Sequence, residues 1–278
     1  MRNHGITPIC TGLVRVKKPF MTRQGGPISS RLRILLSKEF TSDLPIFAWL
    51  IAHPEGDILI DAGLSSGLLR PGYLDSLGRF DAWLTRQLCT FALKPGEQIG
   101  KQLPLIRPSG TRGLRVVMTH LHIDHVDGLS ELAGCEILVN EAEWAHPSGA
   151  PKASLAPLKP LKPKRFAFDR NGDAIFGQSY PITRAGDVIA VPTPGHTQHH
   201  CSIILRRGGI SYIFAGDAVY NQGQLLAGEL AGAHTDARRA ANSIERLSAF
   251  TRNNPTVLLP SHDPDAARRL AENEIVPR

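Results

Sequence analysis

The sequence has no long apolar run and no apolar start. No stretch approaches the roughly 20 consecutive apolar residues that a bilayer-spanning helix needs. The first twenty residues contain no apolar core of signal-peptide length before a small-residue cleavage site. We therefore expect a soluble cytoplasmic protein with no membrane partner.

Cysteine is scarce, and its spacing is irregular. The chain has four cysteines, Cys10, Cys89, Cys135 and Cys201, and no two of them form a Cys-x-x-Cys pair. This spacing argues against a cysteine-based zinc site and gives no disulfide framework. We expect four thiols that pack as small hydrophobic side chains in a reducing compartment.

The balance of charge is basic, with a net charge of +7 and a pI near 9.5, but a nucleic-acid signature is missing. The one dense basic stretch is "LKPLKPKR", residues 158–165, and its prolines exclude a basic helical face. No interleaved aromatic residues accompany it, and the other basic residues are scattered. We interpret the stretch as a solvated surface loop and expect no nucleic-acid partner.

What the chain of 278 residues does have is a series of short β-branched runs bounded by Gly, Pro, Asp or Asn. Such runs are typical of strands. They are "FAWLIAH", "DILIDAG", "LRVVMTH", "CEILVNE", "DVIAVPTPGH", "CSIILRR", "ISYIFAGD" and "TVLLPSH".

Segments of helical periodicity lie between and after these runs. Residues 72–92 fit one face of a helix or helix pair, and residues 237–247 fit another helix with Thr235 or Asp236 as its N-cap. Near the C-terminus, Asp263 is the expected N-cap of a further helix. Alternating strands and helices predict an α/β or α+β layered fold.

We expect residues 1–278 to form a single domain, because the strand-like runs all end in the same kind of residue. Within it we predict a helical insertion at about residues 64–113 and a Pro/Lys-rich surface loop at about residues 145–165.

Five apolar runs each end by placing a histidine or an aspartate in the following loop. Sites assemble at such loops on a rigid scaffold, so we expect these side chains to converge. The five residues are Asp61, His120, His196, Asp217 and His262.

The run that ends at His120 continues as "THLHIDHVDG", which adds His122, Asp124 and His125 within a few positions. Neutral imidazoles and carboxylates are the ligands expected for zinc and similar divalent ions. With His196, Asp217 and His262 the chain offers seven ligand-type residues, enough for two ions.

The order of these motifs resembles a known family. "THLHIDHVDG", followed by "PTPGHT", "FAGD" and "PSHD", is similar to the HxHxDH–H–D–H pattern of the metallo-β-lactamase superfamily, over about residues 46–265. The resemblance implies a four-layer αβ/βα sandwich with metals at one edge between two β-sheets. It also implies that His120, His122 and His196 hold one ion, that Asp124, His125 and His262 hold a second, and that Asp217 bridges both.

Two further residues receive roles from this resemblance. Asp61 would orient a ligand histidine by accepting its other N–H. Tyr220, three residues after Asp217, resembles a tyrosine that touches the substrate carbonyl in N-acyl-homoserine lactonases, the quorum-quenching group; the alternative is a packing aromatic. For His4, His53, His146, His199, His200 and His234 we expect surface or structural histidines.

We therefore predict a dinuclear lactonase that opens the ring of an N-acyl-homoserine lactone by attack of a metal-bridging hydroxide, with Asp124 as proton carrier and Tyr220 stabilising the oxyanion. The donors suit zinc, although cobalt, manganese or iron would also fit. The acyl chain would lie on the apolar face of residues 72–92. The alternative for this face is a contact in a homodimer.

Three alternatives stay open. A thioester hydrolase of the glyoxalase II type shares all seven ligands, and a phosphodiesterase or nuclease would use the positive charge. A metal-stabilised regulatory domain is disfavoured, because structural zinc sites close with four protein ligands.

Overall fold

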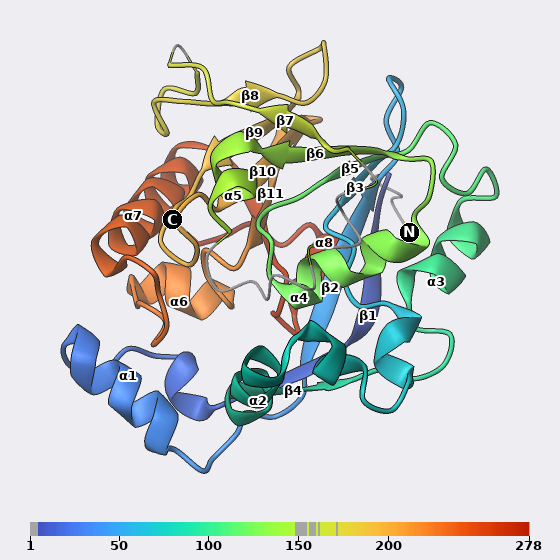
Figure 1. Ribbon diagram of the computed structural model, residues 1–278. Coiled ribbons are helices and arrows are strands. Elements are labelled where there is room, and N and C mark those ends of the chain that lie inside the picture. Colours follow the sequence, from blue (N-terminus) through green and yellow to red (C-terminus); the bar gives the residue numbers. More distant parts are fainter. Residues whose placement is uncertain (1–4, 148–154, 156–159, 161, 171, 278) are drawn as a thin grey trace.

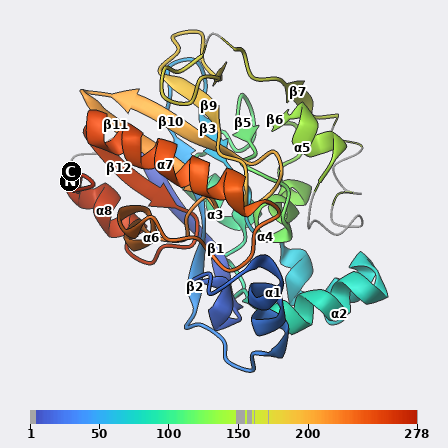
Figure 2. The same cartoon turned by 90° about the vertical axis from the view of Figure 1, so that its left-hand side faces the viewer.

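Two β-sheets face each other, and helices cover the outer face of each (Figures 1 and 2). The computed structural model describes residues 5–147, 155, 160, 162–170 and 172–277. The α-helices are α1 (Pro27–Leu36), α2 (Arg79–Leu88), α3 (Ile99–Ile106), α4 (Ile123–Val126), α5 (Glu141–Ala145), α6 (Gln222–Ala227), α7 (Ala237–Asn253) and α8 (Ala266–Glu272). Short 3₁₀ helices are η1 (Lys18–Phe20), η2 (Ser66–Leu69), η3 (Tyr73–Leu77) and η4 (Asp127–Glu131).

The first sheet has seven strands in the order β4-β1-β2-β3-β5-β6-β7. They are β1 (Ile6–Val16), β2 (Leu44–Ile51), β3 (Ile58–Ile60), β4 (Cys89–Ala92), β5 (Arg115–Val117), β6 (Glu136–Asn140) and β7 (Lys164–Phe166). Strands β4, β1, β2 and β3 pair antiparallel, whereas β3, β5, β6 and β7 pair parallel. The parallel half places the loops after β3 and β5 at the same edge.

The second sheet has five strands in the order β12-β11-β10-β9-β8. They are β8 (Tyr180–Pro181), β9 (Val188–Pro192), β10 (Cys201–Arg207), β11 (Ile210–Gly216) and β12 (Thr256–Pro260). Since β11 and β12 are parallel, Asp217 and His262 leave the sheet at the same edge.

Three of the four apolar clusters in the described residues pack between the layers. The central core joins Trp49 of the first sheet to Phe214 of the second, with ring centroids 5.8 Å apart. A second core packs α3 on the outer face of the first sheet, and a third packs α6 and α7 on the outer face of the second. This arrangement is the predicted αβ/βα sandwich, which is confirmed.

Two of the predicted helices differ in extent from the observed ones. Within residues 72–92, α2 ends at Leu88, and Cys89–Ala92 form β4, which pairs with β1. The last helix begins at Ala266 with Asp265 as N-cap. Asp263 lies two residues before this cap; its carboxylate accepts from the Asp265 and Gln222 backbone N–H groups and pairs with Arg269.

The N-cap of α7 is Asp236, one of the two predicted residues, and its side chain accepts from the N–H groups of Arg238 and Arg239. Strand β1 was not predicted, although it is eleven residues long. Its apolar residues do not alternate strictly, because a register shift follows Cys10 at Gly12, whose φ of +126° favours glycine.

Most of the predicted Pro/Lys-rich loop lies outside the described residues. Its last residues are part of β7, which begins at Lys164. Across the described part of the chain, no helix is long and apolar enough to cross a membrane. All four cysteines are free thiols.

Candidate metal centre

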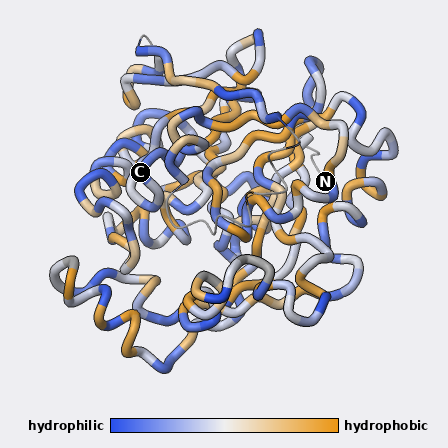
Figure 3. Tube along the Cα trace, in the orientation of Figure 1, coloured by the Kyte–Doolittle hydropathy of each residue, from blue (hydrophilic) through white to orange (hydrophobic). Residues whose placement is uncertain are grey.

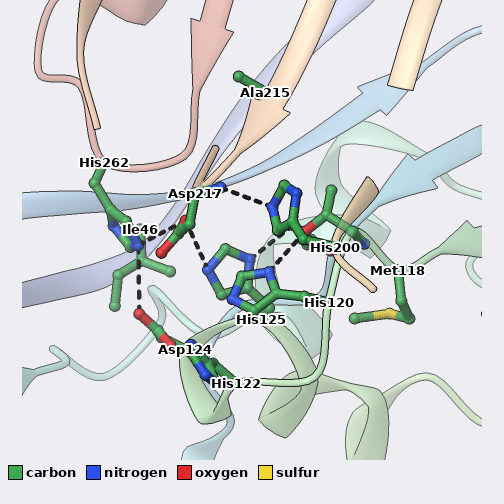
Figure 4. Close-up of polar contacts among 12 residues, drawn as sticks. Ile46, Met118, His120, His122, Asp124, His125, His200, Ala215, Asp217 and His262 are labelled. Carbon is green, nitrogen blue, oxygen red and sulfur yellow. Dashed lines mark hydrogen bonds and ion pairs between the residues drawn. The ribbon is translucent and has the colours of Figure 1, made fainter. Parts of the chain in front are cut away.

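The seven histidines and aspartates singled out in the sequence lie together. Figure 4 shows six of them, His120, His122, Asp124, His125, Asp217 and His262, pointing toward one another. In the described residues three groups of donor atoms each lie within 4.8 Å of one another. The groups are His120–His122–His196, His120–His125–Asp217 and Asp124–His125–His262. The structure thus brings together the two predicted triads, with Asp217 against members of both.

Strand ends position these side chains, as the sequence predicted. The loop after β5 carries His120 and His122 and continues into α4, which carries Asp124 and His125. His196 follows β9, while Asp217 and His262 directly follow the parallel strands β11 and β12.

Asp61 fixes the ring orientation of two histidines. Its carboxylate lies 2.7 Å from His125 Nδ1 and accepts from the Thr119 hydroxyl at 2.8 Å. Because that hydroxyl donates to Asp61, it can only accept from His120 Nδ1, which lies 3.0 Å away. Both imidazoles therefore carry a proton on Nδ1, which leaves Nε2 as the atom available to a metal ion.

His262 is fixed in the same way by a different partner. Its Nδ1 donates to the Pro45 carbonyl at 2.8 Å, and its Nε2 lies 3.4 Å from Asp124 and 3.3 Å from Asp217. On the other side, His196 Nε2 lies 2.9 Å from His122 Nδ1 and 3.4 Å from Asp217.

A hydrogen-bonded chain that the sequence analysis missed holds Asp217 from behind. The Asp217 N–H donates to His200 Nε2 at 3.1 Å, so His200 Nδ1 carries the proton and donates to Thr193 at 2.9 Å. Burial lowers the pKa of His200 to about 3, which keeps the ring neutral. His200 is thus structural, as expected, but it supports the centre directly.

Gly216 makes this close approach possible. Its φ is +54°, and a Cβ there would lie 2.6 Å from His200 Nε2 and 3.0 Å from Thr119. Neither a left-handed conformation nor that space suits a larger residue.

The electrostatics of the centre favour a cation. Burial lowers the pKa of His120 and of His196 well below the usual range. Burial acts the same way on His125, but Asp217, Asp61 and Asp124 outweigh it and raise the pKa of His125. The pKa of Asp217 is held well below its usual range against burial by His262, His125 and His196.

Several atoms in the centre are buried without a hydrogen bond in the described part of the molecule. They are His120 Nε2, His125 Nε2, His196 Nδ1 and Asp217 Oδ1. Buried polar groups normally have partners. Imidazole lone pairs and carboxylates facing one another at these distances are the donors that divalent ions such as zinc take, so the residues fit such ions.

Glu143 on α5 is another residue that sequence reasoning missed. It is 1% exposed, and its Oε2 accepts from the Thr197 hydroxyl at 2.9 Å and the His199 N–H at 3.2 Å. Burial raises its pKa to about 7. Glu143 thereby anchors the loop that carries His196. No local pattern marks it, since the contact spans 54 residues.

The centre forms the floor of a cavity of about 410 Å³. The lining comprises Val14, Val16, Phe20, Met21, Leu44, Leu84, Thr85, Leu88, Cys89, Phe91, His122, Ile123, Asp124, His196, Asp217, Tyr220 and His262. Most of the wall is apolar, and the lining residues that the structure describes include no lysine or arginine. Tyr220 is 6% exposed, with its ring 6.1 Å from His196 and 6.0 Å from His262.

Comparison with known proteins agrees with this geometry. The family model of the metallo-beta-lactamase superfamily matches residues 41–262, which include all seven donors and Asp61. The chain belongs to this superfamily. The resemblance seen in the sequence is thereby confirmed at the level of the family.

Among curated relatives, this chain is 24% identical to N-acyl homoserine lactonase AiiA of Bacillus thuringiensis subsp. kurstaki, over 80% of this chain and 82% of that one. It is also 24% identical to a probable metallo-hydrolase of Mycobacterium tuberculosis, over 78% and 74% of the two chains.

Solved structures share the fold at lower identity. An N-acyl homoserine lactone hydrolase with N-hexanoyl-L-homoserine at its catalytic metal centre has a TM-score of 0.73 at 20% identity, over 95% of this chain and 94% of that chain. The dizinc quorum-quenching lactonase AidC has a TM-score of 0.61 at 16% identity, over 93% and 87%. As a member of this superfamily the protein is similar to quorum-quenching lactonases in both sequence and fold.

Proposed function

We propose that this protein opens the lactone ring of N-acyl-homoserine lactones with two divalent ions. The observation that carries the proposal is the composition of the cavity: five of the seven metal-type donors line its floor, with His120 and His125 buried beside them, and the described residues of its mostly apolar wall include no lysine or arginine. Such a cavity favours a neutral substrate with an acyl chain and a carbonyl that is attacked at the floor.

The two ions would be held by His120, His122 and His196 and by Asp124, His125 and His262, with Asp217 between them. The His and Asp donors suit zinc, and they also fit cobalt, manganese or iron. Bound there, the ions would lower the pKa of water and stabilise negative charge on oxygen.

Tyr220 would donate a hydrogen bond to the oxygen that becomes negative during attack. Burial, together with Asp217 and Asp124, raises the pKa of Tyr220 well above its usual range, so the hydroxyl keeps its proton. Such a donor acts where charge develops in the transition state.

Asp124 would carry the proton. It lies at the start of α4, its side chain is 14% exposed on the cavity floor, and one oxygen is 3.4 Å from His262 Nε2. This position allows its carboxylate to take a proton from the attacking water and return it to the leaving alkoxide.

The two alternative hydrolase reactions fit the cavity less well. Glutathione thioesters and phosphodiesters carry negative charge away from the reacting bond, and sites for such groups normally supply arginine or lysine. Leu84, Leu88 and Phe91 stand instead along the wall. We therefore place lactones ahead of thioesters and phosphodiesters.

The test is hydrolysis of a short- and a long-chain N-acyl-homoserine lactone by metal-analysed protein. Loss of lactone that is reversed on acidification and absent after chelation supports the proposal. Absence of turnover with two ions bound would refute the lactone assignment, and thioester and phosphodiester substrates would then be assayed.

Tyr220→Phe tests the role of the hydroxyl. We expect both ions to stay bound and turnover to fall by about 100-fold, the effect typical of an oxyanion donor. Tyr212→Phe is the matched control, because Tyr212 is equally buried but its hydroxyl bonds to Asn273, outside the cavity. Equal turnover of Tyr220→Phe and wild type would make Tyr220 a packing residue only.

A further inference from the structure

Helices α1 and α2 lie side by side at one end of the molecule (Figures 1 and 2). Several of their large apolar side chains are exposed. Figure 3 shows hydrophobic segments recurring there, away from the sheets. We call this surface the α1–α2 face. It comprises Ile28, Leu32, Leu35 and Leu36 of α1 with Phe80 and Trp83 of α2.

The exposure on α1 is a property of one side of the helix. Ile28 and Leu36 are 75% and 76% exposed, and with Leu32 and Leu35 they follow the spacing of a single helical face. The opposite side is anchored, because Ile34 is buried and the buried Ser30 hydroxyl donates to the Gly232 carbonyl at 2.9 Å. Helix α1 is therefore packed against the protein on one side, and its apolar side chains are exposed on the other.

On α2 the apolar stripe runs from the surface into the cavity. Phe80 and Trp83 are 70% and 54% exposed, with ring centroids 6.0 Å apart. Leu84 and Leu88 continue the same stripe at helical spacing and line the cavity above the candidate metal centre. The exposed face is thus continuous with the wall of the cavity.

The segments that contain this face hold most of the protein's net positive charge. Residues 15–43 contain seven lysines and arginines against two acidic residues, and residues 69–88 contain three against two. The two segments therefore hold a net charge of +6 out of +7 for the whole chain. Arg31 and Arg33 are exposed on α1 between the apolar side chains.

We propose that the α1–α2 face docks on an anionic phospholipid bilayer. The apolar side chains would enter the interface, and the surrounding arginines and lysines would lie against the headgroups, as in other amphipathic surface helices. A second copy of the chain is disfavoured as the occupant, because a two-fold contact would bring two strongly positive surfaces together.

Sedimentation with vesicles tests this proposal without depending on the proposed reaction, because the readout is binding. The metal-loaded protein is mixed with phosphatidylcholine vesicles and with phosphatidylcholine–phosphatidylglycerol vesicles. We expect binding to the second kind, weakened by added salt, and a blue shift of tryptophan emission that Trp83→Phe removes. Equal binding to both kinds, or to neither, would overturn the proposal.

Leu32→Asp with Leu36→Asp is the decisive variant. Both side chains are exposed, so the melting temperature should stay unchanged while vesicle affinity falls about tenfold for each leucine. Leu105→Asp is the matched control, since Leu105 is 84% exposed on α3, apart from the α1–α2 face. Light scattering measures the oligomeric state of the same proteins. If the protein is a dimer that does not bind vesicles, and the double substitution dissociates it, the face belongs to a contact with a second copy instead.

Discussion

Asp61→Asn tests the residue that supports the candidate metal ligands without changing any of those ligands. Asp61 has a left-handed φ of +58°, a conformation that asparagine tolerates, so the backbone should keep its shape. The substitution replaces one carboxylate oxygen with an NH₂ group and removes a negative charge from a side chain that is 1% exposed.

The magnitude follows from the contacts of the carboxylate. Three donors converge on it: the Thr119 N–H and the Thr119 hydroxyl, both at 2.8 Å, and His125 Nδ1 at 2.7 Å. In the place of Oδ2 the amide nitrogen faces the Thr119 hydroxyl and His125 Nδ1, and it would favour the His125 tautomer that carries its proton on Nε2. In the place of Oδ1 it would meet the Thr119 N–H, which cannot accept a hydrogen bond. Loss of such a partner typically weakens metal binding 10- to 100-fold, or about 1.4–2.8 kcal/mol.

The assay is competition of the protein with a chromophoric chelator for Zn²⁺ or Co²⁺. The weaker binding should fall mainly on the site of Asp124, His125 and His262, because His125 contacts Asp61 directly. Asp187→Asn is the control, since its carboxylate pairs with His53 Nε2 at 3.0 Å outside the centre. Unchanged affinity for both ions in Asp61→Asn, or an equal loss in the control, would refute the reasoning.

Three further predictions concern the centre and its supports. Because burial raises the pKa of Glu143 from about 4.5 to about 7, the folded state binds the extra proton between these values. The metal-free protein should therefore lose about 3 kcal/mol of stability relative to Glu143→Gln as the pH rises through this range; parallel denaturation curves would contradict this. Gly216→Ala should lower the free energy of unfolding by more than Gly228→Ala, which meets nothing within 4 Å at a similar φ and should lose only about 1 kcal/mol. Equal losses in urea titrations would show that the contact with His200 costs nothing. Finally, chelation should lower both the melting temperature and any hydrolysis, and Zn²⁺ should restore both; activity that survives metal removal would exclude the proposed chemistry.

The positions of the candidate ligands were predictable because strand runs and ligand spacing are local features. The run that ends at His120 and the "HLHIDH" segment mark one side of the centre, and the runs ending at Asp217 and His262 mark the other. The prediction that Asp61 supports a ligand histidine also agrees with the observed contact to His125. The predicted extent of the helical region at residues 72–92 was wrong because its last residues pair with a distant strand. They form β4, which follows α2 directly and pairs with β1.

The sequence by itself thus determined the layered fold, the family and the convergence of seven donors. Only the tertiary structure decided that His200 and Glu143 support the centre and that the described wall of the cavity is mostly apolar. It also decided that exposed apolar side chains of α2 continue into that wall. The physical reason is distance along the chain. Periodicity and motif spacing report on neighbours within a few residues, whereas these features depend on contacts between segments that only folding brings together.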